Sequence, residues 1–372
     1  MEEAVKNELI KATASNARHS TVQQLARPFV SVVLPCYNEE AILPGNLARV
    51  IEYLDSKKES FRWQIVIVND GSKDETGEIA DRFAKQNDRI KVIHHPVNLN
   101  LGHALQSGFR HSDGDIIVVL DVDLSYSVEY VGQMVDKMQE TMSDIVIASP
   151  YMKGGQVTGV PFMRALMSRF VNKFMSVAAQ DKYHTFTSMA RAYRGDFIRS
   201  LNLKTKDYEI NPEIMYKGMI LRSRMVEIPA HLDWTEQNKF AGKRTSGLRV
   251  FRGVLSGLMS GFIFRPYMFF IVLGTILFLL SMYQLIWLLS DTIAGMNHIL
   301  SHGGATPNPF SYSLSMQFKE NPHTFLTGGI TFLAAIQFLG LGFLSLQNKR
   351  YFEELFHLGT SLKKQAYKND SV

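Results

Sequence analysis

The sequence predicts an α/β domain with a mainly parallel sheet, followed by a helical module that lies in a membrane. Short β-branched runs alternate with amphipathic stretches before residue 246, and two long stretches without a charged side chain follow. Acidic and amide residues stand directly behind several predicted strands, where a sheet of this class binds its ligands.

Five short runs rich in β-branched residues predict strands. They cover residues 30–34, 64–68, 90–93, 116–120 and 145–148. Helical patterns fill the gaps, for example over residues 40–55 and 73–85. Strands that alternate with helices form a mainly parallel sheet covered on both faces, so we expect functional residues just after each strand.

The composition excludes some classes of protein. The net charge is only +5, whereas a nucleic-acid-binding domain concentrates far more positive charge on one face, so we expect no nucleic acid as partner. The single cysteine, Cys36, lies in an apolar run, which is typical of a small core residue in a reducing compartment. Residues 1–28 are mixed and charged, so they predict a polar extension rather than a signal peptide or an anchor.

The two uncharged stretches, residues 266–290 and 324–348, predict transmembrane helices. Each has roughly 25 residues, enough at ~1.5 Å per residue to cross a hydrocarbon core of ~30 Å. The alternative, a buried helical hairpin in a soluble protein, is disfavoured because such helices rarely lack charge over this length. We therefore expect a two-helix module over residues 266–348, with the lipid bilayer as partner.

Positive charge is concentrated outside these spans, whereas the loop between them, residues 291–323, has Lys319 as its only Lys or Arg. The positive-inside rule then places this loop outside the cytosol and both termini, including the tail 349–372, inside it. The flanking cations are Arg244, Arg249, Arg252, Arg265, Lys349, Arg350, Lys363 and Lys364.

Residues 247–265 carry apolar side chains at helical spacing immediately before the first span, with arginines and serines on the other side. This pattern is typical of an amphipathic helix in the membrane interface. An ordinary helix packed on the preceding domain is the alternative.

Polar groups follow the first, second and fourth predicted strands. Residues 34–40 read Leu-Pro-Cys-Tyr-Asn-Glu-Glu, residues 69–74 read Asn-Asp-Gly-Ser-Lys-Asp, and residues 121–123 read Asp-Val-Asp. The carboxylates of Glu39 and Asp70 can accept hydrogen bonds from a nucleobase or a ribose. The second segment also has ordinary turn chemistry, which is the structural alternative.

Asp121 and Asp123 directly follow an apolar strand, where solvation is normally scarce. A divalent cation would account for them. Mg²⁺ or Mn²⁺ prefers oxygen ligands and would offset the negative charge that builds on a nucleoside-diphosphate leaving group. An isolated Asp-x-Asp is also common in turns.

In order and spacing, these three segments resemble the nucleotide-sugar domain of family 2 glycosyltransferases with the GT-A fold. Residues 157–172, 187–188, 191–194 and Glu213 further resemble the dolichyl- and undecaprenyl-phosphate sugar transferases. The resemblance covers residues 29–246 and implies a Rossmann-like GT-A domain there. The paired spans resemble bacterial members with two such helices, which implies a multi-pass protein of the bacterial inner membrane with a cytosolic catalytic domain.

The resemblance also implies roles for individual residues. The catalytic residues would be Asp121, Asp123, Arg164 and Ser168, of which the last two hold the acceptor phosphate. Asp121, Asp123 and Ser125 would bind Mg²⁺ or Mn²⁺. The nucleotide-sugar site would contain Pro35, Tyr37, Glu39, Asp70, Asp121, Glu213, Lys243 and Arg244. Lys243 and Arg244 belong to a glycine-containing basic loop that would close over the diphosphate, although a solvated linker has the same composition.

Helical spacing supports the acceptor assignment. Arg164 and Ser168 are four residues apart and so point to one side of a helix, and Asn172 continues the same stripe. An arginine and a hydroxyl that lie side by side on a helix suit a phosphate. Apolar neighbours would let the helix lie against lipid. These neighbours are Phe162, Leu166, Met167, Phe170 and Phe174. A solvated arginine on a surface helix is the alternative.

Some positions depart from the family pattern. Pro150 stands where many relatives have an arginine, for which Lys153 is a candidate substitute. The segment 97–104 lacks the family's arginine ahead of its glycine-rich turn, and Met189-Ala190 replaces the usual Gly-Phe. Ser125 occupies a metal-ligand position that is often glutamine. These changes affect the sugar and acceptor geometry more than the nucleotide site.

The predicted function is transfer of a hexose-type sugar, with inversion, from a nucleoside-diphosphate sugar to a polyprenyl monophosphate at the cytosolic membrane face. A UDP-sugar is favoured as donor, and cell-envelope glycan synthesis is the expected context. The alternatives are a transferase with another lipid or glycan acceptor, a processive polysaccharide synthase, and an inactive nucleotide-binding scaffold. A processive synthase normally carries a Gln-x-x-Arg-Trp motif, which this sequence lacks. Self-association into a homo-oligomer is compatible with all of these.

Overall fold

The computed structural model describes residues 27–179, 183–235, 266–301 and 307–369. The chain forms two compact units, Met1–Ser260 with Gly359–Val372 and Gly261–Leu358. The expected interfacial helix at 247–265, the basic loop with Lys243 and Arg244, and nearly all of the N-terminal extension lie outside the described residues.

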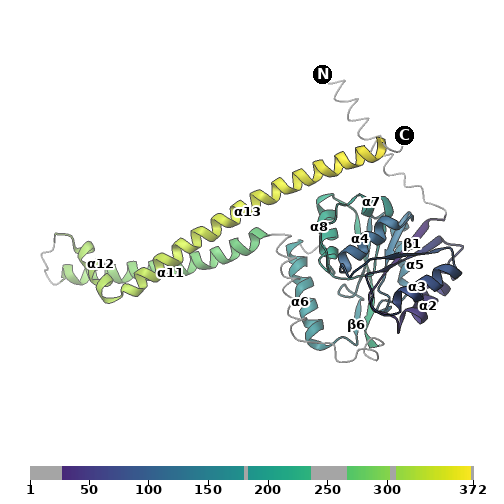
Figure 1. Cartoon of the computed structure of the whole chain (residues 1–372). Helices are drawn as coiled ribbons and strands as arrows, with labels where there is room; N and C mark the ends of the chain where they lie inside the picture. The colour runs from purple at the N-terminus through teal and green to yellow at the C-terminus, as the bar shows by residue number, and fades with distance from the viewer. Residues whose placement is uncertain (1–26, 180–182, 236–265, 302–306, 370–372) are drawn as a thin grey trace, which may run out of the picture. The chain divides into compact units, whose positions relative to one another are not determined.

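The first unit is built on a seven-stranded, mainly parallel sheet, which confirms the predicted α/β domain (Figure 1). The strand order is β3-β2-β1-β4-β7-β5-β8, and within this sheet β7 runs antiparallel to both neighbours. All five strands expected from the sequence are present. The strands are β1 (Phe29–Cys36), β2 (Arg62–Asn69), β3 (Ile90–His94), β4 (Ile116–Val119), β5 (Ile145–Ser149), β7 (Arg191–Arg194) and β8 (Met225–Pro229).

Helices cover both faces of this sheet. α2, α3 and α5 pack with alternate side chains of β1, such as Val32, in the main apolar core. α4 lies on the opposite face, where a Cβ on Gly108 would come within 2.4 Å of Val33 Cγ1. Because β1 is buried on both faces, its near-continuous apolar sequence fits a central parallel strand. The helices are α2 (Leu43–Ser56), α3 (Thr76–Gln86), α4 (Leu101–His111), α5 (Tyr130–Thr141), α6 (Phe162–Ala178), α7 (Gly195–Ser200) and α8 (Ile210–Ile220).

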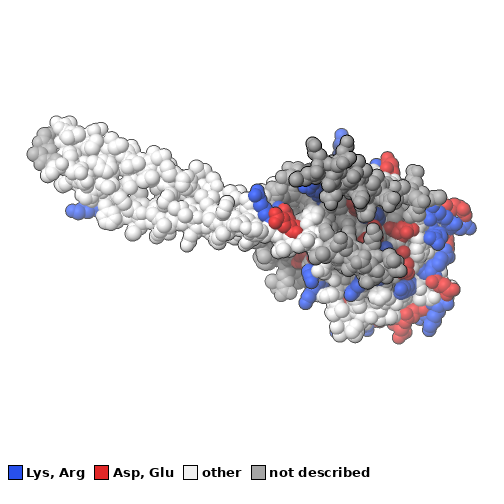
Figure 2. Space-filling view, turned by 90° about the horizontal axis from the view of Figure 1, so that it is seen from above, with Lys and Arg blue, Asp and Glu red and all other residues white. Residues whose placement is uncertain are grey.

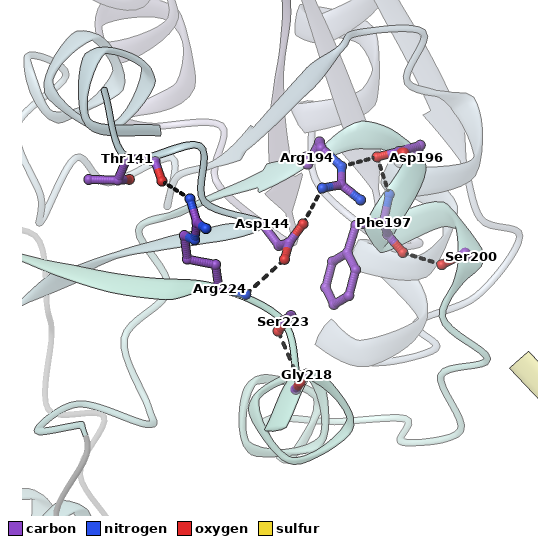
Figure 3. Close-up of polar contacts among 9 residues, drawn as sticks. All are labelled: Thr141, Asp144, Arg194, Asp196, Phe197, Ser200, Gly218, Ser223 and Arg224. Atoms are coloured by element: carbon purple, nitrogen blue, oxygen red, sulfur yellow. Dashed lines mark hydrogen bonds and ion pairs between the residues drawn. The ribbon is translucent and has the colours of Figure 1, made fainter. Parts of the chain in front are cut away.

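A cluster around Asp144 fastens the antiparallel strand (Figure 3). Asp144 precedes β5 and accepts hydrogen bonds from the guanidinium of Arg194, at the end of β7, and from the backbone N–H of Arg224 at 2.8 Å. The Arg224 guanidinium donates to Thr141 O at 2.7 Å. These contacts lie at the amino ends of β5 and β8, so they brace the sheet at the edge away from the carboxyl ends of the parallel strands.

A small second sheet pairs β6 (Gln156–Thr158) in parallel with β9 (His231–Asp233). The backbone N–H of Asp233 donates to Ser125 O at 2.9 Å. The small sheet therefore adjoins the loop that carries the Asp-Val-Asp motif.

The second unit consists of apolar helices. α11 (Pro266–Ser301) and α13 (Pro322–Asn369) each contain a stretch long and apolar enough to cross a membrane, with mean hydropathy of 2.2 and 1.9. Figure 2 shows these helices as white along most of their length, because few Lys, Arg, Asp or Glu side chains lie on them. Only 11% of each apolar window is buried, which contrasts with the core helix of a soluble protein.

Small residues let α11 and α13 approach each other closely. A Cβ on Gly274 would lie 2.9 Å from Leu339 Cγ, and one on Gly342 would lie 2.7 Å from Ile271 Cγ1. Glycine at such contacts is typical of helix pairs that associate in membranes, where close backbone approach replaces the hydrophobic driving force.

The segment 291–323, which we expected to be a loop, is largely helical. α11 continues to Ser301, and α12 occupies Pro309–Glu320. Asn308 caps α12 by accepting a hydrogen bond from the backbone N–H of Ser311 at 3.1 Å, and proline suits the first helical turn. α11 continues past residue 290 although Asp291 and several polar residues follow, because residues 291–301 contain no proline that would end the helix.

Candidate functional site

The carboxyl ends of three adjacent parallel strands meet at one edge of the sheet. β1 ends at Cys36 opposite Asn69 of β2, and β4 pairs with the other side of β1. Asp70 follows β2 and Asp121 follows β4, the two strands on either side of β1. Tyr37 follows β1 itself. Pro35 lies within β1, opposite Val68, and Tyr37 is 41% exposed. The structure thus brings together the segments that the sequence pointed to.

Asp121 and Asp123 lie in a strongly acidic environment. Burial, followed by the charges of Asp123 and Glu39, raises the pKa of Asp121 well above its usual value. Burial also raises the pKa of Asp123, although hydrogen bonds from Ser125 oppose the shift. Two carboxylates in such a place are costly to ionise, and an added positive charge would relieve the cost.

These residues fit a hard divalent cation that is completed by a substrate. Mg²⁺ is commonly held by one or two carboxylates together with phosphate oxygens and water. In the ranges that the structure describes, three or more His, Cys, Asp or Glu side chains nowhere cluster as a complete metal site. The protein would therefore supply the two carboxylates, and a diphosphate would supply further oxygens.

Ser125 shapes the loop between the carboxylates and the small sheet. Its backbone N–H donates to Asp123 Oδ1 at 2.9 Å, and its side chain is 4% exposed. Its position is compatible with orienting Asp123. The assignment of Ser125 as a direct metal ligand stays a prediction.

Asp70 is 4% exposed and is held from two sides. Its Oδ1 accepts hydrogen bonds from His95 Nδ1 at 2.7 Å and from the backbone N–H of Leu99 at 3.0 Å. His95 Nε2 in turn contacts Ser107 Oγ at 2.9 Å. His95 was not expected from the sequence, because nothing in the local pattern connects it with a carboxylate 25 residues earlier.

Hydrogen bonds between side chains and backbone connect the loops after β1 and β2. Asn38, which has a positive φ of 57°, accepts from the backbone N–H of Lys73 at 2.9 Å. The backbone N–H of Glu39 donates to Thr76 Oγ1 at 2.8 Å. Gly71 has a φ of 68°, and a Cβ there would lie 2.2 Å from the Val97 carbonyl carbon. These contacts hold Glu39 and Asp70 on loops that cannot move independently.

Glu213 lies on α8 and contacts the loop that precedes this helix and a lysine one turn later. It accepts hydrogen bonds from the backbone N–H of Lys204 at 2.8 Å and of Thr205 at 2.9 Å, and it pairs with the ammonium of Lys217. Burial raises its pKa, but the hydrogen bonds from Lys217 and Thr205 outweigh this and lower it. Glu213 therefore orders the loop before α8, and its contact with a nucleotide-sugar stays a prediction.

Tyr208 lies just before α8 and is 72% exposed. Burial of its phenol, followed by the charges of Asp207 and Asp121, raises the pKa of Tyr208, and the charge of Arg164 opposes this shift. The sequence gave no signal for Tyr208, because an isolated tyrosine in a loop is unremarkable.

α6 carries the predicted acceptor residues on one stripe. Ser168 Oγ accepts a hydrogen bond from the phenol of Tyr151 at 2.7 Å. Asn172, 1% exposed, donates to Thr187 Oγ1 at 2.9 Å and accepts from the backbone N–H of Phe186 at 2.7 Å. Asn172 therefore fastens α6 to the segment 185–188. The guanidinium of Arg164 stacks on the ring of Trp234, another residue that the sequence did not single out.

The opposite side of α6 is apolar and exposed. Its residues recur mainly at intervals of three or four positions, which places them on one face at 100° per residue. The exposed fractions are 77% for Phe162, 61% for Met163, 49% for Leu166, 58% for Phe170, 41% for Phe174 and 44% for Val177. One helix thus presents polar acceptor residues on one side and a stripe of large apolar side chains on the other.

Comparison with known proteins points to one enzyme family. Residues 31–201 match the model of a family described as glycosyl transferase family 2. A dolichyl-phosphate beta-glucosyltransferase of Trichomonas vaginalis is 33% identical over 152 residues, which is 39% of this chain and 47% of that protein. A dolichol-phosphate mannosyltransferase of Pyrococcus furiosus is 31% identical over 203 residues, 54% of this chain and 55% of that protein. The chain therefore spans about half the length of these curated relatives.

Solved structures show a more distant likeness. A glucosyl-3-phosphoglycerate synthase from Mycobacterium tuberculosis, crystallised with Mn²⁺, uridine diphosphate and phosphoglyceric acid, is 17% identical with a TM-score of 0.48. The match covers 64% of this chain and 80% of that one. A likeness at this level supports no conclusion about ligands.

Proposed function

Residues 31–201 form a glycosyltransferase family 2 domain, and from this premise we propose that the chain transfers a sugar from a nucleoside-diphosphate sugar to a polyprenyl monophosphate. The observation that carries the proposal is that Arg164 stacks on Trp234, whose neighbour Asp233 is hydrogen-bonded to Ser125 in the loop of the buried carboxylates Asp121 and Asp123. Two buried carboxylates suit a diphosphate with its cation, and an arginine beside them suits a second phosphate. The donor is a hexose-type nucleotide-sugar, with a UDP-sugar favoured.

The donor site is formed by the carboxyl ends of β1, β2 and β4. Asp70 and Glu39 face the nucleoside, and Pro35 and Tyr37 belong to the same edge. Asp121 and Asp123 would hold Mg²⁺ or Mn²⁺, which when bound neutralises charge on the diphosphate leaving group. Lys243 and Arg244 remain proposed diphosphate contacts on sequence grounds alone.

The acceptor site is formed by α6. The Arg164 guanidinium and the Ser168 hydroxyl would bind the phosphate of the lipid. An oxygen of this phosphate attacks the anomeric carbon, the bond from that carbon to the nucleoside diphosphate breaks, and the configuration inverts. A phosphate monoester has a second pKa near ~6 and is largely dianionic at neutral pH, so the attacking oxygen needs no strong general base. Positioning and charge neutralisation then supply the catalysis.

The membrane brings the acceptor to this site. The relatives named above act, by their names, on dolichyl or dolichol phosphate, whose long chain resides in a bilayer. The apolar face of α6 is the part of the first unit suited to lie against that bilayer. We place the catalytic unit at the cytosolic face of a bacterial inner membrane, where loaded lipids would supply cell-envelope glycan synthesis.

The proposal is tested by incubating membranes that contain the protein with a panel of labelled nucleotide-sugars. We expect one sugar to enter an organic-extractable, mild-acid-labile product, and only when polyprenyl phosphate is present. Label in another lipid or in a glycan would indicate a different acceptor. Absence of any transfer, combined with nucleotide-sugar binding, would instead indicate an inactive scaffold.

A further inference from the structure

Tyr151 directs the hydroxyl of Ser168. The Tyr151 phenol donates to Ser168 Oγ at 2.7 Å. Asn172 Nδ2 lies 3.5 Å from the same oxygen and donates to the Ser168 carbonyl at 2.8 Å. Because the second hydrogen of Asn172 Nδ2 is donated to Thr187 Oγ1 at 2.9 Å, the Tyr151 phenol is the hydrogen-bond donor to Ser168 Oγ.

This arrangement leaves the hydrogen of Ser168 without an acceptor among the described residues. A serine hydroxyl has one hydrogen to donate and two lone pairs. One lone pair accepts from the Tyr151 phenol, and the described residues show no bond from Ser168 Oγ to the carbonyl one helical turn earlier. Ser112, by contrast, donates to the carbonyl of Gly108 four residues earlier at 2.7 Å. The Ser168 hydrogen is thus available to an anionic oxygen.

The loop that carries Tyr151 is tightly folded. Tyr151 follows Pro150 at the end of β5, which runs parallel to β4, so it reaches the same edge of the sheet as Asp121. Gly155 packs on this loop so closely that a Cβ there would lie 2.6 Å from the Pro150 carbonyl. Burial raises the pKa of Tyr151, so the phenol keeps its hydrogen at neutral pH.

The same stripe of α6 reaches the loop of the donor carboxylates. Arg164 stacks on Trp234, and the neighbouring Asp233 donates its backbone N–H to Ser125 O at 2.9 Å.

We propose that Tyr151 is a positioning residue for the acceptor phosphate: its phenol occupies a lone pair of Ser168 Oγ and so directs the Ser168 hydrogen to a phosphate oxygen. This inference rests on the proposed function. A neutral pair of hydroxyls would then face the phosphate, and the Arg164 guanidinium would supply the positive charge.

The experiment compares Tyr151→Phe, Ser168→Ala and the double variant in the full chain, reconstituted with polyprenyl phosphate and the nucleotide-sugar that the wild type uses. We expect Tyr151→Phe to raise the KM for polyprenyl phosphate about threefold to tenfold, the range of one neutral hydrogen bond. The KM for the nucleotide-sugar should change less than about twofold, which corresponds to ~0.4 kcal/mol. The double variant should match Ser168→Ala, because Tyr151 acts through Ser168.

Tyr53→Phe is the matched control, since its phenol donates to Glu129 O at 3.3 Å on α5's amino end and touches no proposed site residue. It should leave both KM values unchanged. The inference would be overturned if Tyr151→Phe left the KM for polyprenyl phosphate unchanged. It would also be overturned if the increases in this KM from the two single variants multiplied in the double variant. In either case the activity of the wild type would still support the proposed function. A wild type that glycosylates no polyprenyl phosphate would overturn both. KM does not depend on the folded fraction, so partial misfolding leaves the comparison valid.

Discussion

The guanidinium carbon of Arg164 lies 4.2 Å from the ring centroid of Trp234. The backbone at this tryptophan is held in place, because the N–H of Trp234 donates to Thr158 O at 3.1 Å and that of Asp233 donates to Ser125 O at 2.9 Å. Trp234 therefore connects the acceptor helix to the loop of Asp123. Stacking restrains the arginine while its N–H groups stay available at the edge of the guanidinium.

We expect Arg164→Ala and Ser168→Ala to raise the KM for lipid phosphate far more than that for the nucleotide-sugar. Arg164→Ala should raise the KM for lipid phosphate more than Ser168→Ala does. A charge-assisted hydrogen bond contributes about 1.5 to 3 kcal/mol and a neutral one about 0.5 to 1.5 kcal/mol. Trp234→Leu should show the same selectivity, with a loss of about 0.5 to 2 kcal/mol. Steady-state kinetics with each substrate varied in turn measures this.

Arg89→Ala is the control for these variants, because Arg89 stacks on Trp63 at 3.8 Å in a pair unconnected with the site. It should change neither KM. If the three site variants raise only the nucleotide-sugar KM, Arg164 and Ser168 belong to the donor side.

Asp123→Asn should abolish transfer and leave the fold intact, because the amide keeps the shape of the side chain but loses the charge that a divalent cation needs. Removing one of two mutually repelling carboxylates should also raise the melting temperature of the metal-free protein. Mn²⁺ should raise the melting temperature of the wild type and have little effect on the variant. Full activity in Asp123→Asn with an unchanged metal requirement would contradict the assignment.

Glu213→Gln should destabilise the first unit by about 1 to 3 kcal/mol at pH 7, since it replaces the ionised partner of Lys217. The folded-state pKa of Glu213 is lowered. Its contribution is therefore fully present above the unfolded pKa of about 4.3 and is lost as the pH falls through the lower folded value. Unfolding followed by circular dichroism should show the two proteins converging at acid pH.

The same variant tests the predicted donor contact. If Glu213 only orders the loop before α8, the variant should leave the nucleotide-sugar KM unchanged. A rise of about tenfold in this KM would place Glu213 in the donor site. A constant stability difference across the acid range would contradict the assigned pKa shift.

The parallel part of the fold could be predicted because its signals are local. Continuous apolar runs such as 116–120 are typical of strands buried on both faces, and polar residues after them indicate the binding edge. The antiparallel strand β7 could not be predicted in this way. Its four residues, Arg191–Arg194, include two arginines, and their strand form depends on pairing with β4 and β5.

The candidate site was predictable in its carboxylates and its helical stripe, but not in the residues that hold them. Arg191 is fully buried and donates to Phe186 O and Ser188 O, although an arginine is normally expected at the surface. His95 and Tyr151 contact residues 25 and 17 positions away. Such contacts depend on where loops meet, which composition and spacing do not encode.

Asp144→Ala should lower stability by about 1 to 3 kcal/mol, because it removes the acceptor of Arg194 Nη1 and of the Arg224 N–H, although Arg194 Nε keeps its bond to Asp196. Both KM values should stay unchanged, since the cluster braces the opposite edge of the sheet. Asp55→Ala is the control: it breaks an exposed pair with Arg89, which is worth about 0 to 1 kcal/mol. Equal decreases in the free energy of unfolding of the two variants would contradict a structural role for the Asp144 cluster.

The segment between α11 and α13 should lie outside the cytosol, because Lys and Arg are concentrated beyond the other ends of the two helices. Cysteine labelling tests this without a cysteine-free background. The native Cys36 is 2% exposed, and burial raises the pKa of its thiol, so it should not react. We expect a membrane-impermeant maleimide to label Ser311→Cys, an exposed position on α12, in intact cells. Ser60→Cys, exposed after α2, should react only once the inner face is opened. The reverse pattern would place the first unit on the other side, and labelling of both only after opening would show that the two helices do not cross the membrane.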